Sequence, residues 1–223
     1  MKKFKLTSEF IVDISGVKLF RIKALIEFGN VKAGDLGGYI EKEENLSHMG
    51  DAWIYGDAQI SGNAQVFGNA RVFGDAWVSG NARVFGNAWV SGNARVSGDT
   101  QVFGDAWVFG DAQVSGNARV FGDAQVFGNA RVFGNAWVSG DAWIYGDARV
   151  SGDKDYAYAH GFGSCNRTTT FFRLKDGDVG VRCGCFYGTL AQFRDKVCET
   201  HGETKKAQEY LMLADLMEIR FKN

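Results

Sequence analysis

The sequence predicts a mainly β protein whose centre is a solenoid of short parallel strands. From residue 50 to residue 151 the chain reads as 17 consecutive hexads of the form Gly-[Asp/Asn]-Ala-x-[Val/Ile]-[Phe/Ser/Tyr], without an insertion. Serine fills the sixth position in five of six hexads when every third hexad is taken from Ser61, which indicates an 18-residue order. The 223 residues include 30 glycines and no proline, as expected if nearly every segment must donate N–H groups to a sheet.

The hexad itself predicts the geometry of one strand and one bend. Alanine and valine stand two positions apart, so they point to the same side of a strand, while the x residue between them points to the other side. Glycine and Asp/Asn favour the bend. If three hexads make one coil, 17 hexads make nearly six coils and a rod roughly 27 Å long.

The array resembles the hexapeptide-repeat family, in which an aliphatic residue is followed four positions later by a small one, as Val66 is by Ala70 and Val120 by Ala124. This resemblance implies a left-handed parallel β-helix with three hexads in each triangular coil. We therefore expect a mainly β fold: a left-handed parallel β-helix (hexapeptide-repeat solenoid) with a small β-rich N-terminal cap and a C-terminal α+β module.

Three units follow from the limits of the repeat: an N-terminal β-rich cap over residues 1–49, the solenoid over 50–154 and the C-terminal α+β module over 155–223. In the cap, residues 10–14 and 17–22 read as a hairpin around Ser15-Gly16, and residues 34–40 lead into the first coil. Such a cap would cover the open end of the solenoid core.

In the C-terminal module we expect strands over 168–174 and 179–185. Thr189 can cap a helix that ends at Gly202, and a second helix is expected from about 204 to 221. The apolar stripe of that second helix consists of Ala207, Tyr210, Leu211, Ala214 and Met217.

The whole layout resembles hexapeptide-repeat proteins of bacteriophages and prophages. The shared pieces are the sequence of residues 34–40, the unbroken array, and tail motifs that include Thr168-Thr169-Thr170-Phe171, Cys183-Gly184-Cys185-Phe186 and Thr200-His201-Gly202. The resemblance implies a protein that works in the cytoplasm of a bacterial host. No apolar run of about 18 residues exists, which argues against a membrane span, and a net charge of −1 argues against a nucleic-acid binder.

Many hexapeptide-repeat proteins are acyltransferases that use a histidine as general base. This array contains no histidine, and His48 lies just before its first hexad. We therefore expect a protein that is not an enzyme and uses no cofactor, with acyl transfer as the alternative.

The densest group of varied polar residues lies in the C-terminal module: Arg167, Thr168, Thr169, Arg182 and His201. Guanidinium and hydroxyl groups suit an anion or a nucleotide phosphate, so these residues form the predicted ligand- or partner-binding site. The alternative is an ordinary strand with solvated arginines.

Cysteine and histidine in the same module raise the question of a metal site. Cys183 and Cys185 could supply two ligands, with Cys165, Cys198, His160 or His201 completing a tetrahedral set. Two strand thiols buried under a helix explain the same spacing, so we predict no metal.

Aromatic residues on the outside of the array are the remaining signal. Four tryptophans fall on one predicted face, and together with Phe109 they form the predicted oligomer or partner interface: Trp53, Trp89, Trp107 and Trp143. Aromatic ladders that only stabilise the rod are the alternative.

The sequence thus predicts an oligomeric scaffold or binding protein of phage type. The oligomer is a trimer by resemblance to the family, and the ligand is a host protein or a sequestered small molecule, in one form nucleotide-like. An acyltransferase and an end-to-end filament are the alternatives.

Overall fold

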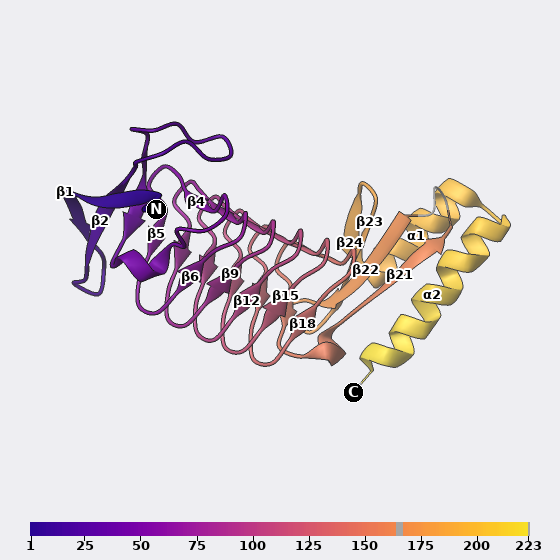
Figure 1. Ribbon diagram of the computed structural model, residues 1–223. Helices are drawn as coiled ribbons and strands as arrows, with labels where there is room; N and C mark the ends of the chain where they lie inside the picture. The colour runs from indigo at the N-terminus through magenta and orange to yellow at the C-terminus, as the bar shows by residue number, and fades with distance from the viewer. Residues whose placement is uncertain (164–166, 223) are drawn as a thin grey trace.

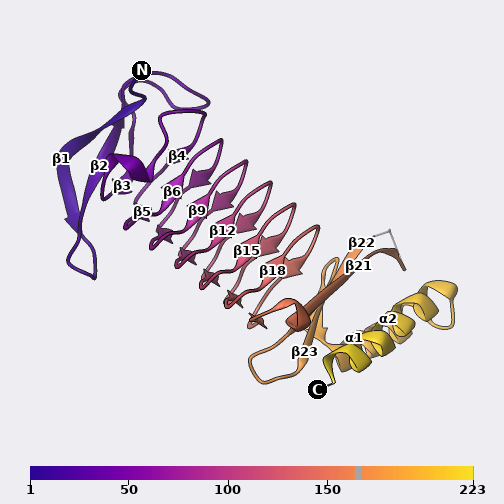
Figure 2. The ribbon, with the colours of Figure 1, turned by 60° about the horizontal axis from the view of Figure 1, so that its bottom comes forward.

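The computed structural model describes residues 1–163 and 167–222. They form a rod with one folded unit at each end: an N-terminal β region and a C-terminal sheet covered by two helices (Figures 1 and 2). The predicted fold class, a β-solenoid with a β-rich N-terminal region and a C-terminal α+β module, is confirmed.

Two-residue strands make up the array, one to each hexad, and they stack in three columns. The Trp face contains β4 (Trp53–Ile54), β7 (Arg71–Val72), β10 (Trp89–Val90), β13 (Trp107–Val108), β16 (Gln125–Val126) and β19 (Trp143–Ile144). The Phe face contains β6 (Gln65–Val66), β9 (Arg83–Val84), β12 (Gln101–Val102), β15 (Arg119–Val120) and β18 (Trp137–Val138). The Ser face contains β5 (Gln59–Ile60), β8 (Trp77–Val78), β11 (Arg95–Val96), β14 (Gln113–Val114), β17 (Arg131–Val132) and β20 (Arg149–Val150).

Neighbouring strands of a column are parallel and lie 18 residues apart in the sequence. Trp89 pairs with Trp107, and Val90 with Val108. Backbone N–H groups donate to carbonyls of the next coil, as Gln59 N does to Ala76 O at 2.9 Å. The coil predicted from the order of the serines is therefore confirmed.

The alanine and the valine or isoleucine of every hexad are fully buried and fill the interior of the rod. Thr100, which stands at the alanine position of its hexad, is also fully buried. Its Oγ1 has no hydrogen-bond partner within the described part of the chain. The array core is thus apolar except at this one position.

The glycine of each hexad adopts a left-handed backbone conformation, with φ between 62° and 77°. At Gly98 a Cβ atom would also lie 2.7 Å from the carbonyl oxygen of Gly116 in the next coil. The corner therefore admits only glycine. Asn and Asp side chains stack beside these corners, as in the 2.8 Å bond from Asn81 Nδ2 to Asp99 Oδ1.

The N-terminal region consists of β1 (Phe4–Val12), β2 (Lys18–Ala24), β3 (Leu36–Ile40) and the short 3-10 helix η1 (Glu43–Asn45). β1 and β2 form the predicted hairpin, although β1 begins earlier than expected. β3 pairs in parallel with β5, so residues 34–40 lead into the array as predicted.

Side-chain donors of this region make the hydrogen bonds that backbone N–H groups of a preceding coil would otherwise make. Lys3 Nζ donates to Gly50 O at 3.2 Å and to Ala52 O at 2.8 Å. Asn45 Nδ2 donates in the same way to the equivalent glycine and alanine carbonyls of a neighbouring corner, at 3.1 and 2.8 Å. Inside the array, backbone N–H groups fill these positions. The first coil is therefore hydrogen-bonded like the others.

The C-terminal module begins with the 3-10 helix η2 (Asp153–Asp155). Four antiparallel strands follow, β21 (Tyr156–Phe162), β22 (Arg167–Arg173), β23 (Val179–Cys183) and β24 (Phe186–Thr189), and then α1 (Leu190–His201) and α2 (Lys205–Phe221). Thr189 caps α1 and Gly202 ends it, as predicted. β21 and β24 are not among the strands predicted from the sequence. No helix of the described residues is long and apolar enough to cross a membrane.

The C-terminal sheet packs on the rod with one face and on the helices with the other. Tyr156 and Phe172 belong to the core of the rod, whereas Phe171 and Val181 pack with α1 and α2. Neighbouring residues of β22 therefore face different environments, and this divides the predicted site.

Candidate functional site

The predicted binding residues of the C-terminal module do not form one cluster. Thr168 and Thr169 are neighbours on β22, so they point to opposite faces of the sheet. Thr169 is buried on the helix side, where its Oγ1 lies 3.1 Å from Cys183 Sγ. Thr168 contacts His160 at 2.9 Å. The expectation of a single site was wrong, because strand alternation separates adjacent residues.

Arg182 also lies on the rod side of the sheet. It pairs in register with Thr170, whose Oγ1 accepts a bond from Trp143 N at 3.0 Å. Its guanidinium group lies 5.2 Å from the Trp143 ring and 5.8 Å from the Tyr145 ring. Arg182 therefore joins the module to the last coils of the array.

Arg167 and His201, by contrast, line one cavity of about 210 Å³ on the helix side of the sheet. Its other lining residues are Cys183, Gly184, Cys185, Phe186, Phe193, Lys196, Val197, Thr200 and Tyr210. No acidic residue is among the described residues that line it. We call this space the module cavity. Lys196 was not among the predicted site residues, because only the packing of α1 on the sheet places it in the same cavity as Arg167.

Gly184 places Arg167 at the edge of this cavity. Its φ of 57° turns the chain between β23 and β24. A Cβ atom at this position would lie 2.6 Å from Arg167 Nη1, so a larger residue would displace the guanidinium group.

The same turn overturns the predicted placement of the two cysteines. The strand ends at Cys183 and not at Cys185, so the two thiols do not share one strand face. Cys183 is half-buried beside Thr169 and Tyr210, whereas Cys185 is exposed. Within the described residues no group of three His, Cys, Asp or Glu side chains could hold a metal. Cys165 lies outside the described residues.

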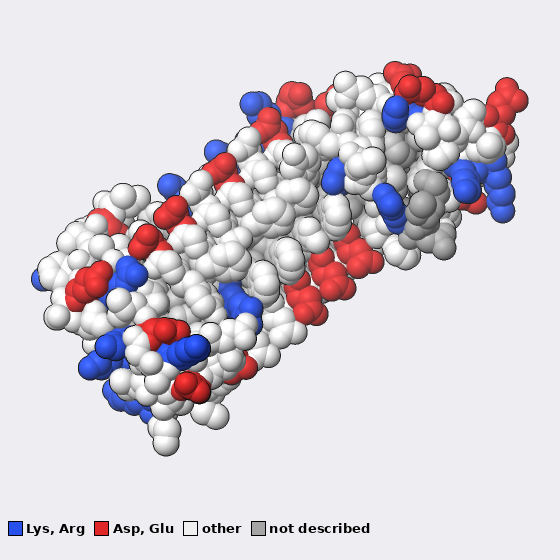
Figure 3. Space-filling view, turned by 90° about the horizontal axis from the view of Figure 1, so that it is seen from above, with Lys and Arg blue, Asp and Glu red and all other residues white. Residues whose placement is uncertain are grey.

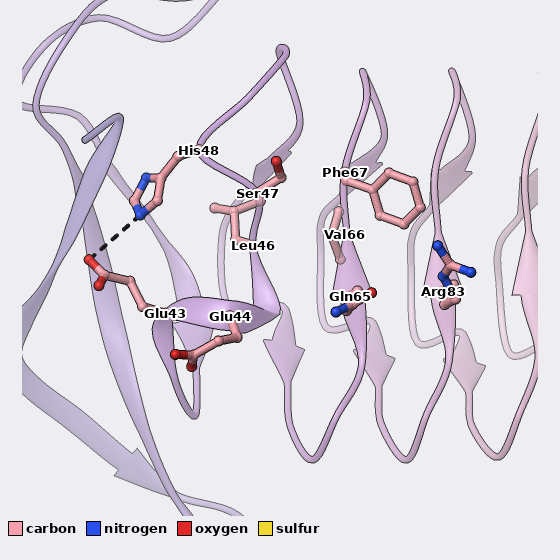
Figure 4. Close-up of a pocket in the computed structure, with 9 residues that line it drawn as sticks. All are labelled: Glu43, Glu44, Leu46, Ser47, His48, Gln65, Val66, Phe67 and Arg83. Carbon is pink, nitrogen blue, oxygen red and sulfur yellow. Dashed lines mark ion pairs between the residues drawn. The ribbon is translucent and has the colours of Figure 1, made fainter. Parts of the chain in front are cut away.

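His48 lies in a second cleft, of about 480 Å³, between the N-terminal region and the Phe face (Figure 4). Its Nδ1 accepts a bond from Lys3 N at 3.2 Å, so a neutral ring carries its proton on Nε2. Nε2 lies 3.6 Å from Glu43 Oε1. A hydrogen bond from Lys2 holds the pKa of Glu43 below its ordinary value, which keeps that carboxylate charged. Nδ1 is thus hydrogen-bonded within the cap, and Nε2 faces the Glu43 carboxylate.

The Trp face retains only part of the predicted interface. Trp53 is 1% exposed, because Phe28 and Phe4 of the N-terminal region cover it with ring centroids 5.3 and 6.3 Å away. Its predicted place on an exposed face was therefore wrong. Trp143 is half-buried beneath Arg182.

Ladder stacking covers much of the rest of the Trp face. The Trp89 and Trp107 rings stack at 5.0 Å, and the Phe109 and Phe127 rings at 4.7 Å. Trp107 remains 41% exposed. Seen from above, the rod shows a strip largely free of charge between rows of acidic side chains (Figure 3). Trp89, Trp107 and Phe109 are the predicted interface residues that remain accessible.

Taken together, the stacked coils and their register define the chain as a β-solenoid repeat protein. The particular repeat is similar to the YdcK Beta solenoid repeat, which matches residues 64–80, 76–92, 88–104, 112–126 and 124–140. These matches lie within the array and leave both terminal units unmatched. A comparison with curated proteins gave no match.

Proposed function

We propose that the protein is a non-enzymatic binding protein in which the rod serves as a scaffold and the module cavity holds a small ligand. The observation that carries this proposal is the convergence of Arg167, Lys196 and His201 on one cavity with aromatic walls. The ligand we propose combines an anionic group with a planar or apolar part, as a nucleotide does.

The chemistry of the cavity supports this ligand class. Arg167 can bind a phosphate or a carboxylate through two parallel N–H groups. Lys196 adds a second positive charge, although it also pairs with Glu199 at 2.8 Å. Phe186, Phe193 and Tyr210 supply apolar surface. Ligand pockets usually measure about 300–1,000 Å³, so the module cavity would take one end of the ligand.

The wider setting of the proposal rests on the tail motifs and on the remaining array aromatics. We propose a protein of phage or prophage type, acting in the cytoplasm of a bacterial host, with a host protein as the other possible partner. Self-association through Trp89, Trp107 and Phe109, as a trimer, belongs to the same proposal. A shift to smaller species in Trp89→Lys/Trp107→Lys, measured by sedimentation equilibrium, is its expected result.

The alternatives have less support. An acyltransferase would need a histidine as general base, and the 17 hexads contain none. A filament would need open rod ends, and folded units cover both of them.

Binding of adenosine monophosphate, adenosine and inorganic phosphate, compared by calorimetry, tests the proposed function. We expect the monophosphate to bind more tightly than either of its parts. Arg167→Ala should weaken this binding at least tenfold, whereas Lys206→Ala, on the exposed side of α2, should not. Absence of binding by all three compounds at millimolar concentration, or equal binding by Arg167→Ala, would contradict the proposal. Native mass spectrometry of the freshly purified protein would report a retained ligand.

A further inference from the structure

Helix α2 is apolar on two opposite sides. One stripe packs on the C-terminal sheet and α1, and consists of Ala207, Tyr210, Ala214, Met217 and Phe221. The other consists of Met212, Leu216 and Ile219, which are 71%, 55% and 70% exposed. These three residues lie within about 60° of one another around the helix. A surface helix is ordinarily polar opposite its buried stripe, so this second stripe, the α2 ridge, indicates a contact outside the chain.

A groove of about 590 Å³ runs beside the α2 ridge. Leu216 forms one wall, and Phe121, Trp137 and Tyr158 line the side formed by the array and β21. Trp137 is 47% exposed and Tyr158 41%. β21 lies between α2 and the last coils of the rod in both views (Figures 1 and 2). An apolar ridge therefore borders a groove whose lining is mostly aromatic and apolar, with Asp153 and Arg220 as its charged members.

We propose that this face binds a second copy of the chain, with the α2 ridge of each copy in the groove of the other. A two-fold interface uses the same patch on both subunits, and a ridge beside a groove is complementary to itself in this way. The proposal is independent of the ligand of the module cavity, and it concerns a surface distinct from the Trp face.

The exposed area supports this choice. The three ridge residues with Trp137 and Tyr158 expose on the order of 400 Å² of apolar surface. A stable interface buries about 800 Å² per partner, of which roughly 65% is apolar in homodimers. The five side chains thus supply most of the apolar area required. On the Trp face only Trp107, among the described residues, is a large apolar side chain classed as exposed.

Sedimentation equilibrium on the full chain tests the proposal. All variants are made in Trp89→Lys/Trp107→Lys, which lacks the association proposed for the Trp face. We expect this parent protein to form a dimer at micromolar concentration, and the added changes Met212→Glu/Ile219→Glu to weaken the dimer at least a hundredfold. Lys206→Gln/Gln208→Glu changes the charge of the same helix equally and should leave the dimer intact. Because the substituted ridge residues are more than two-thirds exposed, circular dichroism should show an unchanged fold. A parent protein that stays monomeric at 100 μM, or a ridge variant that still forms the dimer, would overturn the proposal.

Complementation tests the ridge-in-groove arrangement. Trp137→Glu should also abolish the dimer, because it places a charge in the groove. A mixture of this variant with the ridge variant contains one intact ridge and one intact groove on different chains. We therefore expect a heterodimer in the mixture, detectable by native mass spectrometry. If the mixture stays monomeric while both variants are folded, the ridge does not lie in the partner's groove.

Discussion

At the scale of single residues, Lys3 shows how a charged side chain can complete a solenoid. It is 1% exposed, and its ammonium group lies 4.6 Å from the centre of the Phe28 ring. Two backbone carbonyls accept its hydrogen bonds. Burial lowers the pKa of Lys3 to about 8, although Asp51 acts in the opposite direction.

This pKa predicts how stability depends on pH. Between pH 8 and about 10.5 the unfolded chain holds a proton on Lys3 that the folded chain has lost, so the free energy of unfolding should rise with pH over this interval. Urea unfolding at several pH values should show a smaller rise in Lys3→Met than in the wild type. Lys5→Met, at an exposed position, is the control. Equal pH profiles for Lys3→Met and the wild type would contradict the prediction.

Thr100 predicts a stabilising substitution. Its hydroxyl oxygen is buried without a hydrogen-bond partner in the described chain, and an unsatisfied buried polar group costs about 1–3 kcal/mol. Thr100→Val removes the hydroxyl and keeps the side-chain shape. We expect the free energy of unfolding to increase by about 1 kcal/mol or more, measured by chemical denaturation. An unchanged or lower value would mean that the hydroxyl is satisfied in solution.

At the scale of the element, the periodicity of the sequence predicted the structural elements that are determined by local residue patterns. The hexads, the 18-residue coil and the two capped helices follow from residue spacing and from Thr189 and Gly202. β21 and β24 could not be predicted from residue spacing. β24 has only four residues, one of them Gly188. Both strands are ordered by pairing with their neighbours. The module cavity depends on the same tertiary packing, so of its three basic residues only Arg167 and His201 were predicted.

The alternation within a hexad predicts that the valine position and the x position of the array tolerate substitution very differently. Val90 is fully buried, so Val90→Asp places an unpaired charge in the apolar core, at a cost of several kcal/mol. We expect loss of soluble protein or of cooperative unfolding. Arg95→Gln alters an exposed x residue and should change the melting temperature little. Similar melting curves for the two variants would contradict the assignment of inside and outside.

At the scale of the whole molecule, the two terminal units close the rod. The N-terminal region supplies hydrogen bonds through Lys3 and Asn45 and aromatic cover through Phe28. The C-terminal module supplies apolar cover and a hydrogen bond from Trp143 N to Thr170 Oγ1. Leu174 bridges to Ala148, and Tyr156 and Phe172 extend the core of the array. Sequence alone did not predict this cover, because it joins residues that only the folded module brings to the rod.

Removal of residues 155–223 should therefore leave the array folded but make the protein associate. Repeats depend mainly on their neighbours, so the truncated rod should keep its strand signal in circular dichroism. Its last coil would be uncovered, and light scattering should show association that increases with concentration. A truncated rod that stays monodisperse would show that the module is not needed as a cover, and loss of the strand signal would show that the array cannot fold without it.

The constant register of the coils means that the distance between the two terminal units depends only on the number of coils. Each 18-residue coil hydrogen-bonds to the next through the same positions, while β3 and η1 pack on the first strands of the array and β22 on its last two strands. Insertion or removal of one coil would change the distance between the two ends by one strand spacing, about 4.8 Å, with the same contacts at both ends. A change in the number of repeats can thus alter the distance between the two terminal units without altering the surfaces of those units.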